Sequence, residues 1–318
     1  MTIYLVIYAG VFIFLLIFLI CFMHREAAKI NLETIDLTGS GGVDGGEDGD
    51  RDGGEDRVND VDGGGGGGGD GGAESETNPK SGLRVVQLSD IHIKFNCIPP
   101  GKIISIVLGA APDIVVLTGD YIDSPNDTGR FLTWISGLIG ALEGIPVYMC
   151  YGNHDYTAFD RSPSLKRSLT RDLKKLGAHV LENRSQSFTH GGGTYAITGF
   201  SDYYAAPYYD VRKVANAAPK GVRYHIGISH NPDLALDFDI DKPAPHLVLF
   251  GHFHGGQIWM PFHLEYTCLR KERLCKIGVR KGIHAFRGRT LYISRGLGCV
   301  MFPLRLGSRP EITLLLLP

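Results

Sequence analysis

Residues 249–258 read LFGHFHGGQI, an apolar run that ends in two histidines, His252 and His254, set among three glycines. A short apolar run bounded by glycine is typical of a buried strand. In open α/β sheets, functional groups gather beyond the carboxyl ends of the strands. The stretch therefore predicts a strand whose end carries chemistry.

Similar runs recur from residue 84 to residue 317. They are RVVQLS, DIVVLTG, PVYMCYG, YAITGF, YHIGISH, HLVLFGH, TLYISRG and EITLLLL. Between them, residues 103–110, 128–142 and 164–176 have patterns suited to helices. This alternation predicts an α/β domain of packed sheets flanked by helices, with no second globular domain.

Five predicted strands end in side chains that can bind metal or carry protons. They supply Asp90 and His92 in QLSDIH, Asp120 and Asp123 in LTGDYID, Asn153, His154 and Asp155 in YGNHD, His230 in ISHNPD, and finally His252 and His254. Each piece alone is common by chance. Their combination, in order and at strand ends, predicts one site.

The residue types indicate metal ions. Carboxylates, imidazoles and an amide oxygen suit zinc, manganese or iron. Residues two apart on an extended backbone point to the same side, so Asp90 with His92, and His252 with His254, are expected to converge. The candidates are too many for one ion, whereas two ions that share a carboxylate would use them, an arrangement typical of phosphoester hydrolysis.

The order D-x-H, G-D-x-x-D, G-N-H-[DE], H and G-H-x-H over residues 90–254 resembles the calcineurin-like metallophosphoesterase superfamily. The segments GHFHGGQI, LYISRGLG and LGSRPEITLLLL are similar to a membrane-anchored branch. That branch includes bacterial UDP-2,3-diacylglucosamine pyrophosphatase-like phosphoesterases and the eukaryotic transmembrane protein with metallophosphoesterase domain. The resemblance covers residues 83–317.

The resemblance implies a four-layer α-β-β-α sandwich and assigns a role to each residue. Asp90, His92 and His254 would bind the first metal, Asn153, His230 and His252 the second, and Asp120 would bridge them. His154 would act as the acid near the metals, with Asp123 orienting its ring. Asp155 is expected to support the turn.

The same resemblance implies hydrolysis of a phosphodiester or pyrophosphate, with no covalent enzyme intermediate. The substrate expected is lipid-linked, such as UDP-2,3-diacylglucosamine. Family protein phosphatases carry an arginine after the G-D block that GDYIDSP lacks, which argues against that role. A nucleotide or nucleic-acid phosphodiesterase and a non-catalytic membrane adaptor that keeps the fold are the alternatives.

The N-terminal segment differs in composition from the rest. Residues 2–23 contain no charged side chain, so residues 1–24 are predicted to be a single-pass transmembrane anchor. A cleaved signal peptide is the competing interpretation, but no basic segment precedes the apolar run. Arg25 and Lys29 follow it, which favours a cytoplasmic catalytic domain.

Residues 25–80 are predicted to be a flexible acidic linker, and residues 81–318 the phosphoesterase domain. Residues 39–79 contain 17 Gly and 12 Asp or Glu against two Arg, and such a segment buries too little apolar surface to fold. Residues 81–318 carry a formal charge of +8. This charge suits anionic membrane lipids and phosphorylated lipid or nucleotide-linked substrates. Nucleic acid also fits the charge but is not an expected partner.

A basic segment follows the last histidines. Residues 270–289 hold eight basic side chains and one acidic one, and the aromatic residues Trp259, Phe262 and Tyr266 precede them. The segment is expected to be either a surface that meets lipid head groups or a solvated loop. The six cysteines are expected to be reduced. A Cys268–Cys275 disulfide is the alternative for an extracytoplasmic domain.

Overall fold

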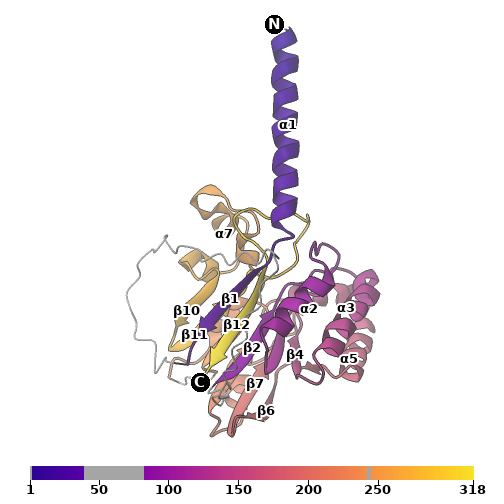
Figure 1. Ribbon diagram of the computed structural model, residues 1–318. Helices are drawn as coiled ribbons and strands as arrows, with labels where there is room; N and C mark the ends of the chain where they lie inside the picture. Colours follow the sequence, from indigo (N-terminus) through magenta and orange to yellow (C-terminus); the bar gives the residue numbers. More distant parts are fainter. Residues whose placement is uncertain (1, 39–81, 242–244) are drawn as a thin grey trace, which may run out of the picture.

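The computed structural model describes residues 2–38, 82–241 and 245–318 (Figure 1). Most of the predicted linker, residues 39–80, lies outside the described residues. The helices are α1 (Thr2–Glu26), α2 (Pro100–Gly109), α3 (Thr128–Ala141), α4 (Asn153–Arg161), α5 (Leu165–Lys175), α6 (Val211–Asn216) and α7 (Leu264–Thr267). Short 3-10 turns are η1 (Pro125–Asp127), η2 (Pro232–Asp237), η3 (His254–Gly256), η4 (Pro261–His263) and η5 (Leu274–Ile277).

The strands form two six-stranded mixed sheets. The first has the order β1-β12-β2-β3-β4-β5 and the second β10-β11-β9-β8-β7-β6. The strands are β1 (Asn31–Asp36), β2 (Leu83–Leu88), β3 (Ile114–Thr118), β4 (Val147–Cys150), β5 (His179–Val180), β6 (Arg184–His190), β7 (Gly193–Gly199), β8 (Tyr224–Ile228), β9 (Leu247–Phe250), β10 (Gly282–Phe286), β11 (Arg289–Ile293) and β12 (Glu311–Leu317). Within each sheet, the central neighbours β2, β3 and β4, and β7, β8 and β9, run parallel.

Three apolar clusters separate the layers. Successive side chains of a strand point to opposite faces, so Val85 of β2 packs between the two sheets while Val86 packs under the helices. Helices α2, α3 and α5 cover the first sheet through side chains such as Phe131 and Leu169. On the far face of the second sheet, α6, η2 and η5 pack against β9 and β11. The order of layers is thus helices, sheet, sheet, helices.

The N-terminal segment is helical as α1, whose described side chains from Val11 to Phe22 are all exposed. Among the described residues, no helix has the length and apolarity needed to cross a membrane. The anchor over residues 1–24 stays a prediction.

Strand β1 corrects the predicted linker boundary. Residues 31–36, which the sequence pattern places in the linker, pair in parallel with β12 and extend the first sheet by one edge strand. Leu37, just after the strand, is buried between the sheets. Local composition fails here because NLETID has only two apolar residues in no alternating pattern, and its alternating half-buried and exposed positions arise only from pairing with β12.

All six cysteines are free, as expected. Cys268 and Cys275 are both free, so the alternative disulfide between them is not present.

Candidate metal centre

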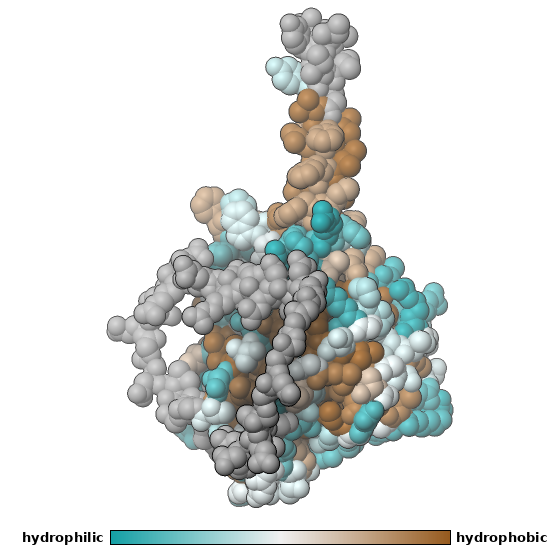
Figure 2. Space-filling model, in the orientation of Figure 1, coloured by the Kyte–Doolittle hydropathy of each residue, from teal (hydrophilic) through white to brown (hydrophobic). Residues whose placement is uncertain are grey.

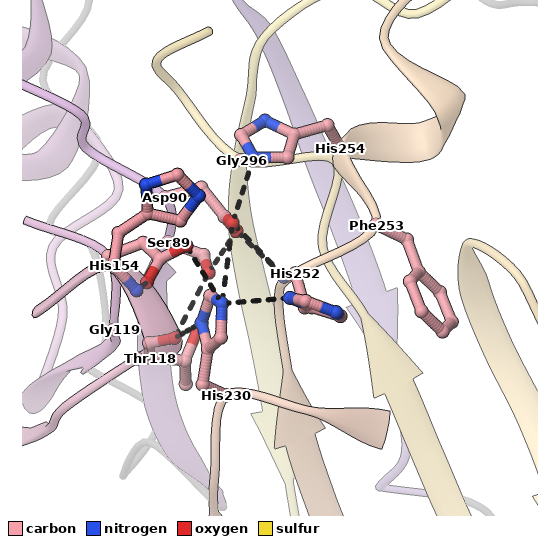
Figure 3. A network of polar contacts seen from close by, with 12 residues as sticks. Ser89, Asp90, Thr118, Gly119, His154, His230, His252, Phe253, His254 and Gly296 are labelled. Carbon is pink, nitrogen blue, oxygen red and sulfur yellow. Dashed lines mark hydrogen bonds and ion pairs between the residues drawn. The ribbon is translucent and has the colours of Figure 1, made fainter. Parts of the chain in front are cut away.

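The carboxyl ends of strands from both sheets meet at one place (Figure 3). Asp90 and His92 follow β2, Asp120 follows β3, and Asn153 begins α4 just after β4. From the second sheet come the residues after β8 and β9. The side chains fall into three groups with mutually close ligand atoms: Asp90, His92 and His254; His92, Asp120 and His154; and Asp120, His230 and His252.

The backbone at these residues is left-handed rather than extended. The φ angles are positive at Asp90 (51°), His92 (39°), Asp120 (57°), His252 (75°) and His254 (53°). Such angles are uncommon for residues other than glycine. Asp90 and His92 converge in one group as expected, but through turns and not along an extended strand, whereas His252 and His254 do not converge. Tight turns after each strand aim the side chains instead, and His252 and His254 face different groups.

Asp120 lies between the groups. Its Oδ2 is 3.0 Å from His230 Nε2 and 3.5 Å from His92 Nε2, and its Oδ1 accepts a hydrogen bond from the His154 amide. Burial alone would raise the pKa of Asp120, but the imidazoles of His230, His154 and His92 hold it well below its usual value. The Asp120 carboxylate is thus ionised, and its position would allow two metal ions to share it.

The first group has its ring nitrogens oriented towards a common centre. His254 Nε2 is 3.2 Å from Asp90 Oδ1. His92 Nδ1 lies 3.0 Å from Asp123 Oδ1, so its proton is held there and Nε2 keeps its lone pair. This Nε2 is buried and has no hydrogen-bond partner among the described residues. A buried nitrogen in that state fits a metal ligand, since an unpaired polar atom is otherwise costly.

The group of Asp120, His230 and His252 shows the same pattern. His230 Nδ1 donates to the Thr118 carbonyl at 2.7 Å, which leaves Nε2 facing Asp120 and lying 3.2 Å from His252 Nδ1. The Asn153 Oδ1 atom is buried and lacks a hydrogen-bond partner within the described part of the chain. These nitrogen and oxygen donors fit a second divalent cation. The clusters of buried histidines and aspartates are consistent with a dinuclear metal site.

Glu272 is a residue that the sequence analysis missed. It is buried, and its Oε1 lies 3.0 Å from His252 Nε2. Burial would raise the pKa of Glu272, but the hydrogen bond from His252 lowers it to about 2. The bond holds the His252 proton on Nε2 and leaves Nδ1 for a metal. The available signal was that Glu272 is the single acid in the basic segment 270–289.

His154 stands at the edge of the site with its side chain about a third exposed. Its Nδ1 lies 2.7 Å from Asp123 Oδ1, the same oxygen that contacts His92. Burial would lower the pKa of His154, but Asp120 and Asp123 raise it to about 9. In this arrangement His154 carries a proton on Nε2 at neutral pH, as a general acid requires.

Asp155 is buried beneath the site. Its carboxylate accepts hydrogen bonds from the backbone amides of Gly152, Asp120, Tyr121 and Ile122. It therefore ties the loop after β3 to the start of α4. Asp155 contributes to the geometry of the site and belongs to none of the three ligand groups.

The glycines around His252 and His254 make room for protein atoms. A Cβ at Gly251 would lie 1.9 Å from Ser89 Oγ and 2.3 Å from Asp90 Oδ2, and one at Gly255 would lie 2.4 Å from Ser308 Oγ. Gly255 also has a positive φ of 57°. These two glycines let the two sheets approach closely enough to join their halves of the site.

When bound, a pair of divalent cations supplies Lewis-acid stabilisation of phosphoryl oxygens and a nucleophilic water at neutral pH. The chain contributes the carboxylate, amide and imidazole ligands, oriented by Asp123, Thr118 and Glu272. His154 holds a proton at Nε2, where it can be given to a leaving oxygen.

Comparisons with known proteins agree with this chemistry. The family described as calcineurin-like phosphoesterase matches residues 83–256. Uncharacterized metallophosphoesterase YkoQ of Bacillus subtilis is 30% identical over 231 residues, 73% of this chain and 82% of its own length. Phosphodiesterase YaeI of Escherichia coli is 30% identical over 73% of this chain and 81% of its own length. UDP-2,3-diacylglucosamine pyrophosphatase LpxG of Chlamydia muridarum is 28% identical over 74% of this chain and 83% of its own length.

The matched family segment covers more than half of the chain and contains all of the residues in the three ligand groups. YkoQ and YaeI align with more than two thirds of the chain at 30% identity. With a metal-ligand centre of histidines and aspartates at the strand ends, the chain belongs to the calcineurin-like phosphoesterases.

Proposed function

We propose that this metal-dependent phosphoesterase hydrolyses a phosphodiester or a pyrophosphate, and that its substrate is lipid-linked. One observation carries the reaction class: two ligand groups meet at the ionised carboxylate of Asp120. The residues of these groups would hold a pair of cations, which would supply stabilisation of the attacking and leaving oxygens in a phosphoryl displacement.

Two relatives support the bond type. YaeI is named a phosphodiesterase and LpxG a UDP-2,3-diacylglucosamine pyrophosphatase, and each aligns with almost three quarters of this chain. The substrate proposed within this class is lipid-linked and resembles UDP-2,3-diacylglucosamine. Membrane localisation with a cytoplasm-facing domain accompanies it as a prediction.

The reaction class is tested with the purified full chain and Asp120→Asn. With manganese, the wild type should hydrolyse bis-p-nitrophenyl phosphate, and the variant should lose this activity together with bound metal, because the bridging charge is gone. Asp160→Asn makes the same change at an exposed position of α4 and should behave as wild type. Equal activity of Asp120→Asn and wild type would refute the two-metal assignment.

The substrate class is tested by comparing rates on UDP-2,3-diacylglucosamine, glycerophosphodiesters, cyclic AMP, single-stranded DNA and phosphomonoesters. The proposal expects the highest kcat/KM on the lipid-linked pyrophosphate or diester. A preference for cyclic AMP or DNA would instead establish the nucleotide or nucleic-acid phosphodiesterase alternative.

A further inference from the structure

Two loops beside the metal centre expose large apolar side chains. Trp259 (54% exposed) and Phe262 (89%) belong to the loop that follows η3, and Met301 (70%) and Phe302 (57%) belong to the loop between β11 and β12. We call these four residues the apolar rim. Scattered single apolar residues are normal on a protein surface, but a contiguous group marks an interaction site.

The backbone at the tips of both loops is unusual. Phe262 has φ of 59° and Met301 has φ of 64°. A bulky residue in the left-handed region is strained, and such strain persists where the surrounding structure holds it, commonly at functional sites. At both tips the strained residue is one that presents a large apolar side chain to the outside.

The two loops form one surface because they are bonded together. Ile258 and Leu306 form a parallel bridge, and the Trp259 amide donates to the Leu306 carbonyl at 2.8 Å. The Gln257 side chain donates to the Val300 carbonyl at 3.0 Å. The apolar rim is therefore a fixed surface and not two independent loops.

Arg305 connects this surface to the metal centre and to α1. Its guanidinium is fully buried, with Nη2 3.3 Å from His254 Nδ1. Its backbone amide donates to the Met23 carbonyl near the end of α1 at 3.2 Å. Figure 1 shows α1 leaving the domain at the same end as α7, which follows Phe262 in the chain. The loop that carries Met301, Phe302 and Arg305 thus contacts both the base of α1 and the metal centre.

The surroundings of the rim are apolar and cationic. The described side chains of α1 from Val11 to Phe22 are exposed and form a continuous apolar surface (Figure 2). Arg25, at the end of α1, and Lys94 are exposed cations. The loop that contains Lys94 contacts both α1 and the loop between β11 and β12. Cys97 Sγ lies 3.9 Å from His24 Nε2 and 3.9 Å from the Pro303 carbonyl.

We propose that the apolar rim rests on the surface of a bilayer that contains anionic lipids. Large apolar and aromatic side chains next to cations fit the boundary between acyl chains and phosphate head groups. The contact turns the metal centre towards the head groups. It therefore selects phosphodiester or pyrophosphate substrates anchored in the bilayer, a part of the inference that rests on the proposed function.

The contact is testable because the chain has two tryptophans, one in the rim and one remote from it. Trp134 on α3 is buried against the first sheet. The full chain is reconstituted in phosphatidylcholine and phosphatidylglycerol vesicles as Trp134→Phe and as Trp259→Phe. Lipids with brominated acyl chains should quench the fluorescence of Trp259 several-fold in the Trp134→Phe variant. They should leave the fluorescence of Trp134 unchanged in the Trp259→Phe variant, since bromine quenches only on contact.

A second experiment measures the consequence for catalysis. Phe262→Ser, Met301→Ser and Phe302→Ser are combined in one variant. Tyr208→Ser with Ile240→Ser, two exposed apolar positions outside the rim, form the control. The rim variant should lose roughly tenfold or more in rate on a vesicle-embedded phosphodiester, because each large side chain withdrawn from lipid is a sizeable loss of apolar burial. Its rate on soluble bis-p-nitrophenyl phosphate should equal that of the control.

The outcomes separate the rim from the proposed function. An unquenched Trp259 in vesicle-bound protein overturns the contact, even when α1 alone attaches the chain. A blue-shifted Trp259 in a dimer without lipid assigns the rim to a second copy and also overturns it. If quenching occurs but no protein hydrolyses the soluble diester, the lipid contact stands and the proposed function fails.

Discussion

At each of three histidines in the metal centre, one ring nitrogen is engaged by the protein and the other faces the ligand cluster. Asp123 engages Nδ1 of His92, the Thr118 carbonyl engages Nδ1 of His230, and Glu272 engages Nε2 of His252. A histidine can bind a metal only through a nitrogen without a proton, and the engaged nitrogen determines which one that is. These three partners therefore set the ligand geometry before any ion binds.

Glu272 permits a direct test of this principle. Glu272→Ala should weaken metal binding by about 10–100-fold, because His252 loses the acceptor that fixes its tautomer. Glu272→Gln, whose side-chain oxygen still accepts the hydrogen bond, should recover part of the affinity. Titration calorimetry with manganese measures both values.

Glu265 offers the matched control for Glu272. It is also buried and lies in α7, shortly before Glu272 in the chain, but its carboxylate accepts a hydrogen bond from the Met260 amide and does not contact His252. Glu265→Ala should keep wild-type metal affinity. Equal weakening in both alanine variants would mean that the effect is a general loss of local structure.

The loss of rate on replacing His154 should depend on whether the leaving oxygen of the substrate needs a proton. His154→Gln should lower kcat by about 10²–10⁴ on an alkyl phosphodiester, whose leaving oxygen needs a proton. On bis-p-nitrophenyl phosphate the loss should be small, because p-nitrophenolate leaves without protonation. Metal content, measured by mass spectrometry, should stay at the wild-type level. The same loss on both substrates would contradict the role as an acid.

At the scale of elements, strand β1 has a consequence for any truncated form of the chain. It covers the edge of β12 in six paired positions, and Leu37 fills the space between the sheets. Without β1, the apolar strand EITLLLL would become an unprotected edge, which promotes association between chains.

A chain that begins at residue 81 should thus be less stable than one that begins at residue 27. The expected loss in the free energy of unfolding is roughly 3 kcal/mol, from the burial of Leu37 and Ile35 and the strand hydrogen bonds. Urea unfolding followed by circular dichroism measures it. Equal midpoints and slopes for the two chains would show that β1 contributes nothing to stability.

The elements that the sequence predicts are those with strong local patterns. The buried central strands and helices α2, α3 and α5 lie within a few residues of their predicted ranges. Strands β6 and β10 have half-exposed patterns, as in RSQSFTH, which do not differ from those of a loop. Helix α4 begins directly at NHD, where the polar ligands hide the start of its apolar face.

In the candidate site too, features with a strong local sequence pattern are predictable and features imposed by tertiary contacts are not. Its ligands stand at the ends of buried strands, so strand topology alone predicts that they meet. The left-handed turns at Asp90, Asp120 and His252 do not follow from composition, because contacts between the sheets impose them. Glu272 lies 20 residues after its partner His252, and only the folded loop brings the two together.

At the scale of the whole molecule, the metal centre joins the two sheets. Asp90, Asp120 and Asn153 come from the first sheet, and His230, His252 and His254 from the second. Most of these carboxylates and imidazoles are buried where the ends of the two sheets meet. Cations held by these residues would offset the charge of the carboxylates, so metal binding should stabilise the whole domain.

Metal removal should therefore lower the melting temperature. At a metal concentration of about 100 times Kd, binding stabilises the folded state by about 2.7 kcal/mol. For a domain of this size that corresponds to a shift of about 5–10 °C. Differential scanning calorimetry of the full chain, after chelation and after adding manganese, measures the shift. Asp120→Asn should melt at the same temperature with and without manganese, whereas a metal-induced shift of equal size in that variant would show that the ions stabilise the protein from another site.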